Sequence, residues 1–236
     1  MANRFFAESP IAGDQAELSG SEAHHAIHVM RLGIGDSITL FDGTGMEYHA
    51  RIEHADRRRL GLSILDCRLV DRELPFTLSL AVALPKGDRQ RWLIEKATEL
   101  GVTRLIPLVT ARGVAQPSTS SLKRLRRTVV EASKQCGRNV LMRIEESLTW
   151  TACVSSLTKE ENRWVAHPSS EGLSLAAARR SRAATQSLVV AIGPEGGFTP
   201  AEIREASAAG WKIVSLGPRL LRIETAAIAI ASAVVS

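Results

Sequence analysis

The sequence predicts an α/β protein in two parts: a small β-barrel over residues 1–72, and a larger α/β domain with a mainly parallel sheet over residues 73–236. Three observations lead to this prediction. A chain of 236 residues corresponds to about one and a half domains of roughly 150 residues each. Short alternating strands with tight turns fill the first seventy or so residues, as in small barrels. Apolar strands then alternate with helices, as in α/β domains.

The first part is expected to consist of short strands and one helix. Strands are predicted at Ser37–Phe41, Glu47–Ile52 and Leu60–Leu65. The turn signal Asp42-Gly43 separates the first two strands, and the charged run Arg57–Arg59 precedes the third. A helix is expected from Ala23 to Met30, because Ser19 and Glu22 have the spacing of a capping box.

The second part follows a charged segment, Asp71–Pro75, that is a plausible linker. Its strands are predicted at Thr77–Leu84, Arg104–Val109, Arg163–His167, Ser187–Ile192 and Lys212–Leu216. Its helices are predicted at Arg89–Leu100, Ser121–Cys136, Thr199–Gly210 and Thr225–Val235. The third helix has the strongest start signal, with Thr199 as N-cap, Pro200 at the first helical position and Glu202 two residues later.

Composition excludes several classes of protein. Hydrophobic residues make up 44% and charged residues 23% of the chain, as in ordinary soluble proteins. No apolar run approaches the roughly 18 to 20 residues of a membrane span, and the N-terminus lacks the apolar core of a secretory signal. A cytoplasmic protein is therefore expected, with no membrane partner. The 3 cysteines form neither a disulfide framework nor a zinc spacing. His24 and His28 lack a third ligand at a useful spacing, so no metal is expected.

Three loops that follow predicted strands are candidate ligand sites, because ligands of α/β sheets bind beyond the carboxyl ends of the strands. The glycine-rich segment Gly193–Phe198 lets the backbone approach a ligand closely, so binding is favoured over a tight connector. In Leu216–Thr225, Glu224 or Thr225 could simply cap the last helix. The arginines of this loop, Arg219 and Arg222, could be solvated or face phosphates.

The third loop, Pro85–Arg89, lacks the Walker spacing, and the chain has no G-x-G-x-x-G motif. In the plainer interpretation Asp88 is an N-cap. Basic residues are more clustered than the net charge of +5 and the pI of about 9.5 suggest. The clusters are Arg57–Arg59; Lys123, Arg124, Arg126 and Arg127; Lys134, Arg138 and Arg143; and Arg179, Arg180 and Arg182. Several such runs in one chain favour an anionic polymer, RNA or DNA, as partner over solvated faces.

Seven motifs, taken together and in order, resemble the RsmE family, the 16S ribosomal RNA uracil-N3-methyltransferases of the SPOUT superfamily. They are Arg4–Phe6; His25–Arg31 with Gly35-Asp36; Lys86–Arg89; Ile94–Gly101; Gln135–Arg138; Ile192–Phe198; and Leu216–Ala226. They span nearly the whole chain, and the last two are highly specific. One departure is visible in Arg112-Gly113-Val114, because the family tends to have Ser after this Arg. The role of Arg112 is thereby open.

The resemblance implies that the second part is a SPOUT-type α/β domain with a trefoil knot over about 190–236, and that the N-terminal barrel is a PUA-like RNA-binding module. Sequence rules alone argue against a knot, because knots are nearly absent from protein folds. The implied methyl donor is S-adenosylmethionine. The implied partners are 16S rRNA of the small ribosomal subunit, in the decoding-region helix 44, and a second copy of the chain in a homodimer.

The resemblance also implies the residues of the S-adenosylmethionine pocket. They are His167, Gly193, Glu195, Gly197, Leu216, Gly217, Leu221, Arg222 and Thr225. The candidate catalytic residues are Arg222 or Arg138, to stabilise charge on a uracil oxygen, and Glu195 or Glu224, to accept the N3 proton. The candidate RNA-binding residues are Arg4, Arg31, Arg57, Arg58, Arg59, Lys86, Arg89, Lys123, Arg124 and Arg127.

Two other functions stay open. One is a non-catalytic RNA-binding or ribosome-assembly protein that keeps the fold, which the intact Gly193–Phe198 and Leu221–Ala226 motifs argue against. The other is a methyltransferase for another RNA, such as transfer RNA. A test of S-adenosylmethionine binding distinguishes the two classes, because a methyltransferase binds this donor and the non-catalytic protein is not expected to.

Overall fold

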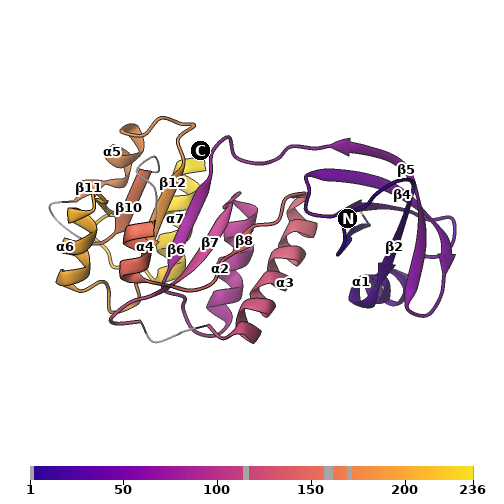
Figure 1. Cartoon of the computed structure of the whole chain (residues 1–236), viewed down its shortest axis with the longest axis horizontal. Coiled ribbons are helices and arrows are strands. Elements are labelled where there is room, and N and C mark those ends of the chain that lie inside the picture. The colour runs from indigo at the N-terminus through magenta and orange to yellow at the C-terminus, as the bar shows by residue number, and fades with distance from the viewer. Residues whose placement is uncertain (1–2, 114–116, 157–161, 169–171, 236) are drawn as a thin grey trace. The chain divides into compact units, whose positions relative to one another are not determined.

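The computed structural model describes residues 3–113, 117–156, 162–168 and 172–235 (Figure 1). The contacts within the chain define two compact units. The first contains Met1–Glu73 together with Ser133–Leu141, and the second contains Leu74–Ala132 and Met142–Ser236. The segment Ser133–Leu141, expected within the α/β domain, therefore groups with the first unit. The domain limits 1–72 and 73–236 stay a prediction.

The first unit is built on a five-stranded mixed sheet with the order β1-β3-β4-β5-β2. Its strands are β1 (Arg4–Phe6), β2 (Gln15–Ser19), β3 (Ser37–Phe41), β4 (Met46–Ala55) and β5 (Arg59–Leu69). Only the β1–β3 pair is parallel, and the other three pairs are antiparallel. The predicted Asp42-Gly43 turn joins β3 to β4, with the Asp42 carboxylate accepting a hydrogen bond from the Thr44 amide at 3.1 Å. The three predicted strands are confirmed, and two of them extend beyond the predicted limits.

One helical segment covers the core of the first unit, and its start differs from the prediction. The segment consists of α1 (Gly20–His24) and the π-helix η1 (His25–Val29). Ser19 is the N-cap but makes no side-chain cap hydrogen bond, so the predicted capping box is wrong. The Glu22 carboxylate instead accepts a hydrogen bond from the Phe6 amide at 3.0 Å and pairs with Lys134 at 2.9 Å. Long-range partners have thus displaced the local cap.

The second unit contains an eight-stranded sheet whose strands all pair in parallel. The strands are β6 (Leu78–Val82), β7 (Arg104–Val109), β8 (Arg143–Ile144), β9 (Leu148–Thr149), β10 (Asn162–Ala166), β11 (Leu173–Ser174), β12 (Leu188–Ile192) and β13 (Lys212–Ser215). Their order is β11-β13-β10-β12-β6-β7-β8, with β9 also paired to β7. Every residue of β6 and β12 is buried, as expected for the centre of a parallel sheet.

Helices cover both faces of this sheet (Figure 1). They are α2 (Asp88–Glu99), α3 (Thr119–Cys136), α4 (Trp150–Ser156), α5 (Leu175–Arg180), α6 (Pro200–Ala208) and α7 (Ile223–Val235). α7 packs on α2, β6 and β12, whereas α4 and α6 contact each other and bury Trp150 and Trp211 in a core with the strands. The capping box at Thr199 is confirmed. Asp88 is not an N-cap, because α2 begins after Gly87.

The connection from β12 to β13 crosses over the intervening strand β10. β13 follows β12 in the chain but pairs on the far side of β10, and α7 then returns to pack on β6 and β12. This crossing brings the ends of β12, β10 and β13 together, while the knot over about 190–236 stays a prediction. Within the described residues, no helix is both long and apolar enough to cross a bilayer.

Candidate functional site

One pocket in the second unit lies at the carboxyl ends of three adjacent strands, β12, β10 and β13. Its volume is about 300 Å³, at the lower end of the roughly 300–1,000 Å³ of small-molecule sites. The lining residues come from the β7–α3 loop and from the segments after these strands. They are Arg112, Ala166, His167, Pro168, Ile192, Gly193, Pro194, Glu195, Gly196, Gly197, Phe198, Leu216, Gly217, Arg219, Leu220, Leu221, Ile223 and Ala226.

The glycine loop, defined here as residues 193–198, forms one wall of the pocket. The Gly197 amide donates to the Pro194 carbonyl at 2.8 Å, which closes a tight turn. Gly197 has φ +67°, in the left-handed region that favours glycine. A Cβ atom on Gly193 would lie 3.0 Å from the Phe198 ring, and Phe198 is itself buried against Trp150. Gly193 and Gly197 therefore meet steric and backbone requirements that other residues would not.

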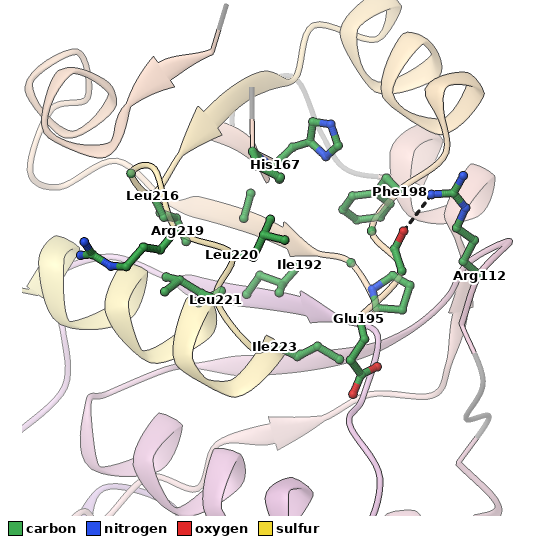
Figure 2. A pocket seen from close by; sticks show the side chains of 18 residues that line it. Arg112, His167, Ile192, Glu195, Phe198, Leu216, Arg219, Leu220, Leu221 and Ile223 are labelled. Carbon is green, nitrogen blue, oxygen red and sulfur yellow. Dashed lines mark hydrogen bonds between the residues drawn. The ribbon is translucent and has the colours of Figure 1, made fainter. Parts of the chain in front are cut away.

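The opposite wall is the leucine loop, defined here as residues 216–222. Figure 2 shows Leu216, Leu220 and Leu221 on one side of the pocket and Phe198 and Arg112 on the other. Leu220 is 85% exposed, which is unusual for an apolar side chain unless a ligand or partner covers it. An apolar wall facing an exposed backbone of glycines suits a flat, partly apolar ligand.

His167 adds a polar group at the end of β10. Its backbone amide donates to the Val214 carbonyl of β13 at 3.1 Å, which fixes the position of the residue. Its Nδ1 atom is buried without a hydrogen-bond partner among the described residues. Burial lowers the pKa of the imidazole, so the ring is uncharged near neutral pH. Within the described part of the chain, His167 thus contributes a buried, unpaired polar atom to the lining of the pocket.

Two carboxylates, one in the glycine loop and one in α7, share a cation. Arg89 Nη1 is 3.4 Å from Glu195 Oε1 and 4.0 Å from Glu224 Oε2. Glu195 lines the pocket and is exposed, whereas Glu224 is 8% exposed in the first turn of α7. Arg89, predicted to bind RNA, therefore connects the two residues that were predicted as proton acceptors.

The structure brings most of the predicted cofactor residues together. Those that line the pocket are His167, Gly193, Glu195, Gly197, Leu216, Gly217 and Leu221. Arg222 and Thr225 do not line it and are exposed at the start of α7. Arg138 belongs to the first unit, where its Nε donates to Glu73 at 2.9 Å and the residue is 3% exposed. That placement favours a structural role for Arg138.

The predicted RNA-binding residues fall into two groups. The Arg4 side chain is 8% exposed in the first unit, where it pairs with Glu47 at 2.8 Å and lies over the Phe41 ring. This favours a structural role for Arg4. The other side chains are exposed except that of Arg89, which is partly exposed. The exposed residues are Arg31, Arg57, Arg58 and Arg59 in the first unit and Lys86, Lys123, Arg124 and Arg127 in the second.

Sequence reasoning missed some residues of the pocket. Ile192, Pro194, Gly196 and Phe198 belong to a predicted motif, but Arg112 lies about eighty residues before it. The Arg112 Nη1 atom donates to the Gly196 carbonyl at 2.8 Å (Figure 2). No sequence signal identifies this contact. Val114, quoted in the motif around Arg112, lies outside the described residues, as do residues 169–171 of the loop after β10.

The comparisons with known proteins agree with this fold. Residues 72–235 match the RNA methyltransferase domain family, and residues 18–65 match the RNA methyltransferase PUA domain family. The fold is thus that of an RNA methyltransferase, and the predicted fold class, a SPOUT-type α/β domain and a PUA-like unit, is confirmed.

Three similar proteins define the family more narrowly. Ribosomal RNA small subunit methyltransferase E from Bacillus subtilis is 31% identical over 92% of this chain and 88% of its own. The protein of the same name from Rickettsia conorii is 33% identical over 96% and 92%. The crystal structure of ribosomal RNA small subunit methyltransferase E from Neisseria gonorrhoeae bound to S-adenosyl methionine matches at 28% identity, with a TM-score of 0.89 over 99% and 96% of the chains. The chain belongs to the ribosomal RNA small subunit methyltransferase E family.

Proposed function

We propose that this protein is a methyltransferase of class EC 2.1.1 that methylates N3 of a uridine in 16S ribosomal RNA, with S-adenosylmethionine as donor. One observation carries the proposal: the glycine loop and the leucine loop enclose one pocket at the ends of β12, β10 and β13. The Neisseria gonorrhoeae relative, which has a similar fold, is bound to S-adenosyl methionine. The decoding-region helix 44 is the proposed target region.

The residues of the pocket fit this donor. Gly197, with φ +67°, and Gly217, with φ +105°, leave room for a ligand, because no atom lies within 4 Å of the place that a Cβ would take at either residue. Leu216 and Leu221 supply apolar contacts. When bound, S-adenosylmethionine supplies an electrophilic methyl group on a positively charged sulfur. The uncharged imidazole of His167 does not repel a cation there, because burial lowers its pKa.

The acceptor nitrogen requires proton removal. N3 of uracil is a poor nucleophile while it carries its imide proton, so a base near the pocket accelerates transfer. Glu195 is the proposed acceptor, because its carboxylate lines the pocket. Glu224 is the second candidate, since its buried Oε2 accepts no hydrogen bond from the described residues. Arg222, exposed beside the pocket, is the proposed cation for a uracil oxygen, whereas Arg138, buried and paired with Glu73 in the first unit, is not proposed for that role.

The substrate is tested by methyl transfer from labelled S-adenosylmethionine to small ribosomal subunits that lack this modification, followed by nucleoside analysis. We expect label in 3-methyluridine. If the protein binds S-adenosylmethionine but transfers no label to these subunits, another RNA would be the substrate. Neither binding nor label would favour the non-catalytic RNA-binding protein and contradict the proposed cofactor residues.

The basic face of α3 is proposed to grip RNA phosphates. Lys123, Arg124 and Arg127 are exposed, whereas Leu122 and Leu125 of the same helix are buried. Replacing the three cations with alanine is expected to reduce the slope of log affinity against log salt by about 2 to 3, because each phosphate contact releases about one counterion. Filter binding to 16S rRNA at several salt concentrations measures this slope. Arg91→Ala, which removes an exposed cation paired with Glu95, is the control. A flat response of the unaltered protein to salt would contradict the proposal.

We also propose a homodimer in the cytoplasm. Trp92, Leu220 and Leu221 are large apolar side chains that are at least 37% exposed in the second unit. Exposed apolar side chains of this size support a subunit interface.

A further inference from the structure

The peptide between Gly196 and Gly197 lies in the middle of the glycine loop and is held at both ends. Its carbonyl accepts a hydrogen bond from Arg112 Nη1 at 2.8 Å, and its amide donates to the Pro194 carbonyl at 2.8 Å. A peptide between two glycines has little steric resistance to rotation, because neither neighbour carries a Cβ. The turn holds the amide of this peptide and Arg112 holds its carbonyl; because the peptide is planar, each of the two contacts limits its rotation.

Arg112 reaches this carbonyl from a short turn after β7. The Gly113 amide donates to the Thr110 carbonyl at 3.1 Å and closes the turn. A Cβ on Gly113 would lie 3.0 Å from Thr110 Oγ1, so the larger Ser that is typical of the family would force Thr110 to shift. Gly113, which stands where the family tends to have Ser, thus fits this turn, and the turn still places Arg112 at the Gly196 carbonyl.

A buried carboxylate holds this turn against the start of α6. Glu202 Oε1 accepts a hydrogen bond from the Ala111 amide at 2.9 Å, and its Oε2 accepts one from the Thr199 amide at 2.7 Å. Glu202 is 7% exposed, and its position in the capping box is fixed by the helix. Because Thr199 directly follows the glycine loop, Glu202 sets the distance between Arg112 and that loop.

We infer that Arg112 is a positioning residue, which fixes the Gly196–Gly197 peptide in the orientation that the methyl donor requires. The inference rests on the proposed function, since it takes the pocket to be the donor site. Arg112 would act by reducing the number of backbone conformations that the loop must give up on binding.

The first test is titration of S-adenosylmethionine into the full-length protein without RNA. Arg112→Ala is expected to weaken binding by about tenfold, because a charge-assisted hydrogen bond to the loop is lost. Arg112→Lys, which can still donate one hydrogen bond to the Gly196 carbonyl, should recover part of this loss. Arg126→Ala is the matched control, because Arg126 also donates to a backbone carbonyl, that of Ile144 at 2.9 Å, and does not line the pocket.

The second test uses amide hydrogen exchange of the protein without donor. The Gly197 amide is expected to exchange about tenfold faster in Arg112→Ala, while the Val190 amide in the core of β12 is unchanged. The value of kcat at saturating donor should stay within about twofold, with the loss confined to the KM for the donor.

Three results would overturn the inference. Weaker binding with unchanged Gly197 exchange would mean that Arg112 contacts the donor directly. Faster exchange of Val190 as well would mean a general structural role, and a fall of kcat at saturating donor would mean contact with the reacting groups. If the unaltered protein binds no S-adenosylmethionine, the proposed function fails, while the exchange of Gly197 still tests whether Arg112 fixes the loop.

Discussion

Replacing Glu47 with glutamine is expected to lower the free energy of unfolding of the first unit by about 3 kcal/mol at pH 7. Glu47 lies on β4, with a side chain 5% exposed, and three arginines surround it. Arg4 Nη1 is 2.8 Å from Oε2, Arg68 Nη2 is 3.0 Å from Oε1, and Arg72 Nη1 is 3.3 Å from Oε2. Glutamine keeps the shape of the side chain but leaves buried Arg4 without its carboxylate.

The Glu47→Gln substitution is expected to weaken more contacts than one ion pair. Arg4 and Arg72 both donate to the Gly137 carbonyl, at 3.3 Å and 2.8 Å, and Arg4 also bonds Asn139. Glu47 therefore holds two arginines that attach Ser133–Leu141 to the rest of the first unit. Removing one partner of a buried, hydrogen-bonded charge costs more than removing an exposed one, because the remaining charge stays desolvated.

The same carboxylate predicts a dependence of stability on pH. Burial alone would raise the pKa of Glu47, but hydrogen bonds from Arg68, Arg4 and Arg72 outweigh it and lower the pKa from 4.5 to about 2. A carboxylate with a lowered pKa stabilises the fold fully above its unfolded pKa and loses this effect as the pH falls towards the folded pKa. The difference in stability between the unaltered protein and Glu47→Gln should thus shrink to roughly half between pH 5 and pH 3.

Urea denaturation at several pH values measures both effects. Glu17→Gln is the control, because Glu17 pairs with Arg59 at 3.8 Å in the same sheet but both side chains are more than half exposed. Its expected change is below about 0.5 kcal/mol. Equal losses in the two variants, or a difference for Glu47→Gln that does not vary with pH, would contradict the role given to Glu47.

The elements of the first unit could be predicted from local signals, but its limits could not. Alternation predicts β3 and β4, and Asp42-Gly43 predicts the turn between them. The attachment of Ser133–Leu141 depends on side chains more than sixty residues away, such as Arg72 and Arg4, and no local pattern records such pairs. At Glu22 a local pattern is present but misleads. Its spacing from Ser19 predicts a helix cap, whereas the Phe6 amide and Lys134 bind its carboxylate instead.

In the candidate site, too, local sequence predicts some features, and others depend on the folded arrangement. The glycine loop could be predicted, because a buried strand, clustered glycines and a capped helix follow each other in the chain. The strand order that brings the leucine loop beside it depends on a crossover, which periodicity does not specify. Contacts of Arg112 with Gly196 and of Arg89 with Glu195 each join residues more than eighty positions apart. They follow from the folded arrangement and not from either motif.

Glu195→Gln is expected to lower kcat for methyl transfer to 16S rRNA by at least about 100-fold, the smaller end of the effect of a general base. Glutamine keeps the shape of the side chain but cannot accept the imide proton. Glu195 Oε1 is 3.4 Å from Arg89 and the side chain is 53% exposed, so an RNA base can reach it. The affinity for S-adenosylmethionine should change little, because the backbone of the glycine loop stays intact. Single-turnover kinetics with saturating donor measure the effect.

Glu224→Gln separates the two candidate acceptors. Glu224 is buried and shares Arg89 with Glu195, so its replacement should reduce kcat less than that of Glu195. A larger loss in Glu224→Gln would transfer the role of base to Glu224. Glu146→Gln is the matched control, because Glu146 also pairs with an arginine, Arg126 at 3.2 Å, and lies outside the pocket. A loss of less than tenfold in both candidate variants, about 1.4 kcal/mol, would remove both carboxylates from proton transfer and leave Glu224 as part of the first turn of α7.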